Sequence, residues 1–430
     1  MTDRHLLFGQ TLEFTGNPFV DGPDAARHRR LGAVMIENGV IAEVGDQADL
    51  AARFPDVART DLGDHLISPG FVDAHVHYPQ TGVVASWGKR LIDWLETYTF
   101  PEEARFGDLD YATEVANRYL DLMLAHGTTT AASFGTVHPE SAEALFQTAQ
   151  ARGLRMAAGK TCMDRNAPED LRDTAQSAYD DSKHLIARWH GKDRLSYAIT
   201  PRFTPTSSPA QLEVLGALWA EHPGCAMQTH LSEQKEEIAW VRRLEPGAYD
   251  YLHTYEIRGL IGPGAVMGHA IHLTEREIGR MAETGTGVAH CPTSNTFIGS
   301  GLCPVSKLMG RGIPVGLGTD TGGGSSFSML RTMATAYEIG QLQGSSLHPS
   351  QLWWLATAGS ASTLRLQSNI GALAPGMEAD LIAVDLASTP AIAQRAARAE
   401  DFWEALFPTI MMGDDRAISA VWIAGKRWLS

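Results

Sequence analysis

Short apolar runs alternate with longer helical stretches through the middle of the chain, from about residue 68 to residue 370. Typical helical stretches are "LDYATEVANRYLDLMLAHG" and "SAEALFQTAQARG". About eight runs are short and apolar: "FVDAHVH", "TTTAASF", "LRMAAGKT", "LSYAITPRF", "CAMQTH", "AVMGH", "TGVAH" and "PVGLGTD". Consecutive βα units of this number predict an α/β fold with a (β/α)8 TIM barrel. A doubly wound open sheet is the alternative, but no G-x-G-x-x-G turn follows a strand.

Both ends of the chain carry patterns typical of β-strands. In "AVMIENGVIAEVG", two apolar runs flank Asn38-Gly39, which predicts a type I′ hairpin. Near the other end, "GALAPGMEADLIAVD" and "AISAVWIAGKRWLS" indicate short strands separated by turn residues. We therefore expect a small composite β-sandwich domain of residues 1–67 and 371–430, with a barrel domain of residues 68–370 inserted between its halves.

The composition narrows the class of protein. The formal net charge is -15, from 35 Lys+Arg against 50 Asp+Glu, so the chain is a poor candidate for binding a nucleic-acid polymer or an anionic membrane. We expect no secretory signal in "MTDRHLLFGQ" and no membrane-spanning segment. The four cysteines form no C-x-x-C pair, which favours buried free thiols and a cytoplasmic location.

Polar residues with metal-binding or charged side chains end several of the apolar runs. In "PGFVDAHVHYPQ", the two histidines are two residues apart, so in a strand their imidazoles point to the same face. In a barrel, the carboxyl ends of the strands meet at the active-site face. We therefore expect these strand-end residues to converge: His75, His77, Arg202, His230, His269, His290 and Asp320.

Each of these residues also has an ordinary structural explanation. A single strand-end histidine is more often a hydrogen-bonded core or surface residue, and His272 in "VMGHAIHL" is most simply a solvated loop residue. Glu233 could belong to an acidic helix start, and Asp320 could be a helix N-cap. It is improbable that all these separate explanations hold at once, so a single metal-binding site is the better interpretation.

Three imidazoles and one carboxylate suit a borderline divalent ion such as zinc, with one position left for water. Water bound to zinc loses its proton near neutral pH, and a carboxylate such as Glu233 could relay that proton. The pattern is typical of a hydrolase.

The chain resembles the amidohydrolase superfamily through H-x-H after "PGFVD", then "TH-x-x-E", "GH-x-x-H" and "GTD" in this order. Longer motifs are similar to those of the guanine deaminases: "YPQ", "LIDWLETYTFPEEARF", "AGKTCMDRNAPE", "AITPRFTPTSS", "THLSEQKEEIAWV" and "CPTSNTFIGSG". The resemblance covers residues 70 to about 415, most of the chain.

The resemblance implies a zinc-dependent hydrolytic deaminase of guanine, active in purine catabolism as a homodimer. It assigns one zinc ion per chain to His75, His77, His230 and Asp320, and the proton shuttle to Glu233. His269 would hydrogen-bond the attacking water and the tetrahedral intermediate, whose oxygen Asp320 would also stabilise. The implied substrate contacts are Gln80, Arg202 and Phe203, with Trp87 expected as a bulky residue near the pocket.

The chemistry of these side chains agrees with a guanine site. Arg202 only donates hydrogen bonds, so it suits the O6 carbonyl of guanine and not the amino group of adenine. Gln80 both donates and accepts, which fits the mixed edge of the base. Phe203 offers a flat apolar surface for the ring, with a plain core phenylalanine as the less favoured alternative.

Three other functions stay open. The chain could deaminate another purine-like or aromatic amine such as 8-oxoguanine, or it could hydrolyse a cyclic amide with two metals bridged by a modified lysine, for which Lys160 is the candidate. An ion-paired or surface lysine is the simpler interpretation of Lys160. A catalytically inactive scaffold of the same fold is the third possibility. The nucleobase deaminases with a P-C-x-x-C motif are excluded, because the chain has no such motif.

Overall fold

The computed structural model describes residues 3–87 and 91–429. By its internal contacts the chain divides into two compact units. The first comprises the residues up to Val72, Leu122–Thr129 and the residues from Ser328 onward, and the second comprises Asp73–Asp121 and Thr130–Phe327.

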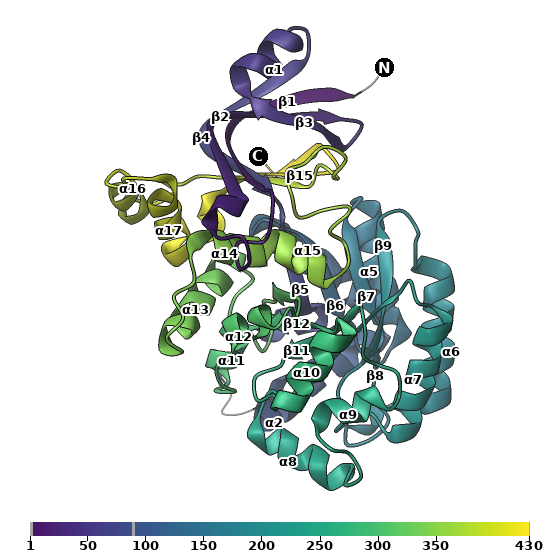
Figure 1. Cartoon of the computed structure of the whole chain (residues 1–430). Coiled ribbons are helices and arrows are strands. Elements are labelled where there is room, and N and C mark those ends of the chain that lie inside the picture. Colours follow the sequence, from purple (N-terminus) through teal and green to yellow (C-terminus); the bar gives the residue numbers. More distant parts are fainter. Residues whose placement is uncertain (1–2, 88–90, 430) are drawn as a thin grey trace. The chain divides into compact units, whose positions relative to one another are not determined.

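Strands from both chain ends form one seven-stranded sheet in the first unit, in the order β16-β15-β14-β4-β1-β2-β3. Figure 1 shows the purple N-terminal strands together with the yellow C-terminal β15. This is the separate sheet, built from both chain ends, that the sequence predicts. Its strands are β1 (Arg4–Phe14), β2 (Ala26–Glu37), β3 (Val40–Asp46), β4 (Ala58–Pro69), β14 (Leu381–Val384), β15 (Ile418–Ile423) and β16 (Lys426–Leu429).

The alternation of side chains along β1 gives this sheet two apolar faces. Leu7 packs into a cluster with β14 and β15 residues such as Leu381 and Trp422. Its neighbours Leu6 and Phe8 face the other way, toward Leu50. Strands from the two ends of the chain thus share a core.

The predicted hairpin is confirmed, whereas two local details differ from the prediction. Asn38 and Gly39 have φ values of 52° and 81°, as a type I′ turn between β2 and β3 requires. Residues 47–53 form helix α1 (Gln47–Arg53) instead of a strand, since Ala, Leu and Gln favour helix and Leu50 is buried. In the stretch from Gly371 to Asp385, only β14 is a strand.

Eight parallel strands form the nearly closed barrel that the sequence predicts. They are β5 (Phe71–His77), β6 (Thr128–Phe134), β7 (Arg155–Gly159), β9 (Leu195–Pro201), β10 (Ala226–Leu231), β11 (Ala265–His269), β12 (Gly287–His290) and β13 (Val315–Leu317), and β8 (Thr161–Cys162) pairs with β9. The first and last strands meet where Asp320 N donates to His75 O at 2.9 Å and His77 N donates to Thr321 O at 3.0 Å. Most strand residues are buried, as expected for parallel strands covered by helices.

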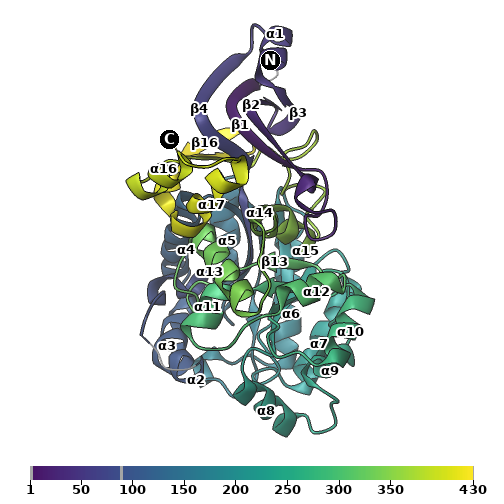
Figure 2. The ribbon, with the colours of Figure 1, turned by 60° about the vertical axis from the view of Figure 1, so that its left-hand side comes forward.

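Helices follow the barrel strands. They are α2 (Leu91–Trp94), α3 (Phe100–Glu103), α4 (Leu109–Ala125), α5 (Pro139–Ala151), α6 (Ala175–Trp189), α7 (Pro209–Glu221), α8 (Lys235–Leu244), α9 (Tyr251–Glu256), α10 (Glu275–Thr284), α11 (Pro292–Phe297) and α12 (Val305–Gly310). Figure 1 shows α6 and α7 side by side outside the strands. Figures 1 and 2 both place α2 and α8 at the same end of this unit.

The remaining helices belong to the first unit: α13 (Met329–Leu342), α14 (Pro349–Trp354), α15 (Ser360–Thr363), α16 (Pro390–Ala396) and α17 (Phe402–Met412). Within that unit α17 packs against α13 and α16. Among the described residues, no helix combines the length and apolarity that crossing a bilayer requires.

Candidate functional site

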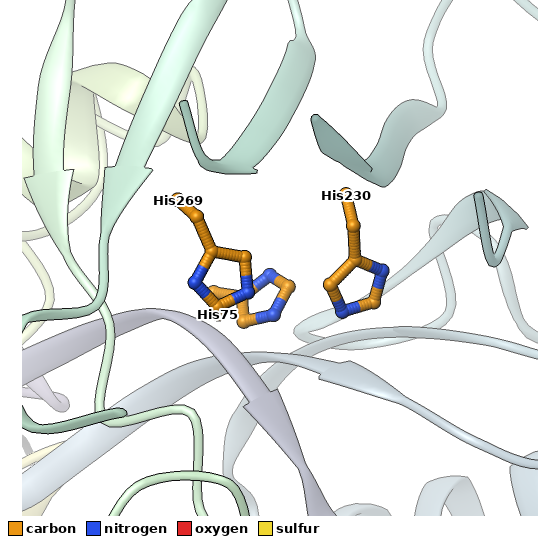
Figure 3. A group of neighbouring side chains, drawn as sticks. All are labelled: His75, His230 and His269. Atoms are coloured by element: carbon orange, nitrogen blue, oxygen red, sulfur yellow. The ribbon is translucent and has the colours of Figure 1, made fainter. Parts of the chain in front are cut away.

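Four histidines and one aspartate from four barrel strands gather at the carboxyl ends of those strands. His75 and His77 lie on β5, His230 on β10 and His269 at the end of β11, and Asp320 follows β13. All five side chains are buried or nearly so. Figure 3 shows the rings of His75, His230 and His269 approaching one another. The structure therefore brings together residues that are up to 245 positions apart in the sequence.

Distances within this cluster are those of a metal cage. His77 Nε2 lies 3.1 Å from His230 Nε2, and Asp320 Oδ1 lies 3.5 Å from His75 Nε2 and 3.6 Å from His77 Nε2. Tetrahedral ligands about 2.0–2.1 Å from a zinc ion are about 3.3–3.4 Å apart. Two sets of three side chains each offer possible ligand atoms that all lie within 4.8 Å of one another. The first set is His75, His230 and His269, and the second is His75, His77 and Asp320.

The hydrogen-bonding of the rings supports the same interpretation. His75 Nδ1 and Nε2 and His77 Nδ1 are buried without a hydrogen-bond partner among the described residues, which is costly for a polar atom unless something else binds it. His230 Nδ1 lies 2.7 Å from Arg202 O, so an N–H at Nδ1 donates there and Nε2 faces the cluster with its lone pair. The donor set fits a divalent metal.

The electrostatics of the cluster favour neutral imidazoles around one carboxylate. Burial lowers the pKa of His75, and lowers the pKa values of His77 and His230 strongly, so these rings stay uncharged and able to ligate. Burial opposes ionisation of Asp320, but the facing His75 ring, 3.5 Å away, and the nearby His269 and His77 hold its pKa below the ordinary value.

The backbone at these strand ends is strained. His269, Ala270 and Asp320 have φ values of 67°, 47° and 47°, in the left-handed region of the backbone that residues with a Cβ rarely adopt. Such conformations cost about 1–3 kcal/mol each and cluster at functional sites. Close packing also requires glycine at Gly268, where a Cβ would lie 2.7 Å from Cε1 of His75.

Asp73 helps to fix the position of this cluster through hydrogen bonds to the backbone beside its ligands. Its carboxylate accepts hydrogen bonds from His75 N at 3.2 Å, from Thr319 N at 3.0 Å and from Thr319 Oγ1. Burial raises the pKa of Asp73 to about 7, against these three hydrogen bonds. The aspartate thereby ties the strand that carries His75 to the residue before Asp320. Sequence reasoning missed this role, although Asp73 lies inside the quoted motif "PGFVD".

Glu233 lies beside the cluster, and a hydrogen bond fixes one of its two carboxylate oxygens. Ser300 Oγ donates to Glu233 Oε1 at 2.7 Å, while Glu233 Oε2 lies 3.6 Å from His269 Nε2. Burial raises the pKa of Glu233 above that of an ordinary glutamate. A buried carboxyl group of raised pKa is suited to both accepting and returning a proton near neutral pH.

His269 faces the cluster with a defined ring orientation. Its Nδ1 lies 2.9 Å from Asn295 Oδ1, so Nε2 faces Glu233 and Asp320, whose Oδ2 is 3.8 Å away. Burial lowers the pKa of His269, but Glu233 and Asp320 outweigh it and raise the pKa above the ordinary value. The ring is therefore suited to donating from Nε2.

A cavity opens directly onto this cluster. It contains about 420 Å³ of space between atoms, including some open to solvent. Its lining combines the cluster with polar and apolar walls: His77, Gln80, Leu91, Trp94, Leu95, Arg202, Phe203, His230, Glu233, His269, Ile298, Asp320 and Gly323. The sequence-predicted Gln80, Arg202 and Phe203 thus share one cavity with the cluster.

Glu103 joins two of the polar wall residues. Its Oε1 accepts from Gln80 Nε2 at 2.8 Å and its Oε2 accepts from Arg202 Nη1 at 2.6 Å. Glu103 is fully buried. It lies in the motif "LIDWLETYTFPEEARF", but nothing in that motif indicates which of its acidic residues turns inward.

Trp87 differs from the other expected substrate contacts. Its side chain is 82 % exposed and does not line the cavity in the described part of the chain. Trp94, one helical segment later, is buried and lines the cavity instead. Spacing alone could not distinguish the two, because burial of one tryptophan or the other depends on tertiary packing.

The other sequence candidates lie apart from the cavity lining. Lys160 is fully buried and forms an ion pair with Asp173, which agrees with the simpler interpretation of this lysine. A ring nitrogen of His272 lies 2.9 Å from Ser300 O. His290 is buried at the end of β12, and its ring nitrogens have no hydrogen-bond partner among the described residues.

Comparisons with known proteins agree with this geometry. The model of the Amidohydrolase family matches residues 66–428. The guanine deaminase of Escherichia coli K12 is 43% identical over 412 residues, which are 95% of this chain and 94% of that protein. The structure of E. coli guanine deaminase superposes with a TM-score of 0.97 at 41% identity, over 99% of both chains. Guanine deaminase from C. acetobutylicum, solved with guanine bound in its active site, superposes with a TM-score of 0.90 at 29% identity, over 99% of both chains.

Proposed function

We propose that this chain, which belongs to the amidohydrolase family, hydrolyses guanine to xanthine and ammonia. One observation carries the proposal: a cage of metal-binding side chains, a buried carboxyl group and a pair of side chains suited to a purine edge line the same cavity. A guanine deaminase with 43% identity over 95% of this chain supports the choice of substrate.

The metal in this proposal is one zinc ion per chain, held by His75, His77, His230 and Asp320. The nitrogen and oxygen separations of 3.1–3.6 Å and the unpartnered nitrogens of His75 and His77 support this set. When bound, zinc lowers the pKa of water and polarises the developing oxyanion.

Guanine binds in the cavity with its O6 edge toward Arg202 and Gln80. Arg202 donates to O6, and Gln80 pairs with the neighbouring N1–H. Phe203 lies against the ring; it is 5 % exposed, and its own ring centroid is 6.2 Å from that of His230. This orientation directs C2, which carries the amino group, toward Glu233.

Glu233 moves the protons. It accepts one from the attacking water and delivers it to N3 as the oxygen adds to C2 and the C2–N3 double bond becomes single. His269 donates a hydrogen bond to the oxygen on the tetrahedral carbon, which Asp320 also helps to position. The hydroxyl group on C2 then gives up its proton, which reaches the amino group; the C2–N bond breaks as the C2 carbonyl forms, and ammonia leaves with xanthine as the other product.

The wider biology follows from this activity. The enzyme serves purine catabolism and, in this proposal, is a cytoplasmic homodimer. The four cysteines support a reducing compartment because each is a buried free thiol. The domain boundaries that accompany this proposal are residues 1–67 with 371–430 for the β domain and residues 68–370 for the catalytic barrel.

A substrate panel tests the proposal. The zinc-loaded protein is assayed for ammonia release from guanine, adenine, cytosine and 8-oxoguanine, with metal content measured on the same sample. We expect guanine to be turned over much faster than the other bases, with one metal per chain. Preferred turnover of 8-oxoguanine, or none of any base by the fully loaded protein, would overturn it.

A further inference from the structure

We propose that Glu103 is a specificity-determining positioning residue: it fixes which end of the Gln80 amide faces the substrate, and thereby selects bases that carry a hydrogen on N1. The proposal deepens the guanine deaminase function above and rests on it. Glu103 does not line the cavity in the described structure, so it acts through Gln80 and Arg202.

The first step is the division of the Glu103 carboxylate between two partners. One oxygen accepts from Gln80 Nε2 at 2.8 Å and the other from Arg202 Nη1 at 2.6 Å. The carboxylate is fully buried, and Arg202 is 3 % exposed. A buried charge of either sign is costly without a partner, so this ion pair holds both side chains in place.

The second step concerns the orientation of the amide. An ionised carboxylate accepts hydrogen bonds but donates none. The NH₂ group of Gln80 must therefore face Glu103, which turns Oε1 of Gln80 away from it. Gly322 packs closely behind: a Cβ there would lie 2.8 Å from Gln80 Cβ and 3.3 Å from Gln80 Oε1.

The third step connects this orientation to the base. Arg202 and Gln80 both line the cavity, so in this proposal Arg202 offers N–H donors to the base and Gln80, whose NH₂ group is taken by Glu103, offers its carbonyl oxygen. Guanine complements this pair, because O6 accepts and the adjacent N1–H donates. A base with a lone pair on N1 would place that lone pair against the Gln80 oxygen, and a site with a mismatched polar group discriminates strongly.

The substitution Glu103→Gln reverses the pattern. The new amide has one acceptor and one donor. Arg202 can only donate, so it takes the acceptor, and the new NH₂ group faces Gln80. The Gln80 amide then rotates to offer its oxygen to that group and its own NH₂ to the cavity.

The probe pair is guanine and 2-aminopurine. Both carry the 2-amino group, but 2-aminopurine has a lone pair on N1 and no O6. We expect Glu103→Gln to lower the ratio of kcat/KM for guanine to that for 2-aminopurine by about tenfold or more, since one hydrogen bond to a polar partner is exchanged for a mismatch. When 2-aminopurine is titrated by fluorescence, metal-depleted Glu103→Gln should bind it more tightly than the metal-depleted wild-type protein does.

Two further variants make the test specific. Glu102→Gln is the matched control, because Glu102 pairs with Tyr111 and Arg105 rather than with Gln80, and it should leave the ratio unchanged. Glu103→Asp keeps an acceptor-only carboxylate, so it should lower activity but retain the guanine preference, and it remains informative if Glu103→Gln does not fold. The proposal is wrong if Glu103→Gln folds and keeps the wild-type ratio, or if Glu103→Asp loses the preference. Failure of the wild-type protein to deaminate guanine would instead refute the proposed function.

Discussion

The hydrogen bond from Ser300 to Glu233 should set the pH range in which the enzyme works. Ser300 Oγ donates to Glu233 Oε1 at 2.7 Å, and both side chains are buried. A hydrogen bond to a charged group is worth about 1.5–3 kcal/mol, and 1.36 kcal/mol corresponds to one pKa unit. Removing this donor with Ser300→Ala should therefore raise the already elevated pKa of Glu233 by about 1–2 units.

The sign of the effect follows from the role of Glu233. The carboxylate must be ionised to accept a proton from water, so kcat/KM rises with pH as Glu233 ionises. A higher pKa moves this acidic limb to higher pH. The measurement is the pH profile of kcat/KM for guanine between about pH 5 and 9, with metal content checked for each variant.

Ser300→Thr is the matched control because it keeps the hydroxyl donor, and it should leave the limb close to the wild-type position. An unshifted limb in a metal-replete Ser300→Ala enzyme would refute the assignment of Glu233 as the ionising group.

Three other perturbations test separate parts of the site. Glu233→Gln should retain the metal and lower kcat by about 10²–10⁴-fold; substantial remaining turnover would remove Glu233 from proton transfer. Asp73→Ala removes the acceptor of the hydrogen bonds from His75 N, Thr319 N and Thr319 Oγ1. We therefore expect a free energy of unfolding in urea that is about 1–3 kcal/mol lower, and metal binding that is about 10–100-fold weaker. Unchanged values in both assays would contradict this role of Asp73. Removing the metal with a chelator should lower the Tm, because the folded state loses the free energy of ligand binding, and zinc should restore it; an unchanged Tm would argue against a metal bound in the folded state.

Much of the site was predictable because its residues lie at points where local pattern and fold agree. The i, i+2 spacing of His75 and His77 places both imidazoles on one face of a strand, and the barrel then brings His230, His269 and Asp320 to the same end. These inferences need only secondary structure and the geometry common to all barrels.

The rest depends on contacts between residues far apart in the chain. Asp73 meets Thr319 across 246 positions, and Glu103 meets Arg202 across 99. Neither pair has a local signature, because any buried acid in a motif has many possible partners. The burial of Trp94 and the exposure of Trp87 likewise depend on tertiary contacts that the local sequence does not indicate.

The most direct test of the account is the conversion of guanine by the purified, zinc-loaded chain, with xanthine and ammonia both quantified and Glu233→Gln as the background. The account predicts one xanthine and one ammonia for each guanine consumed, with the variant near background. Full metal occupancy without xanthine formation would contradict it.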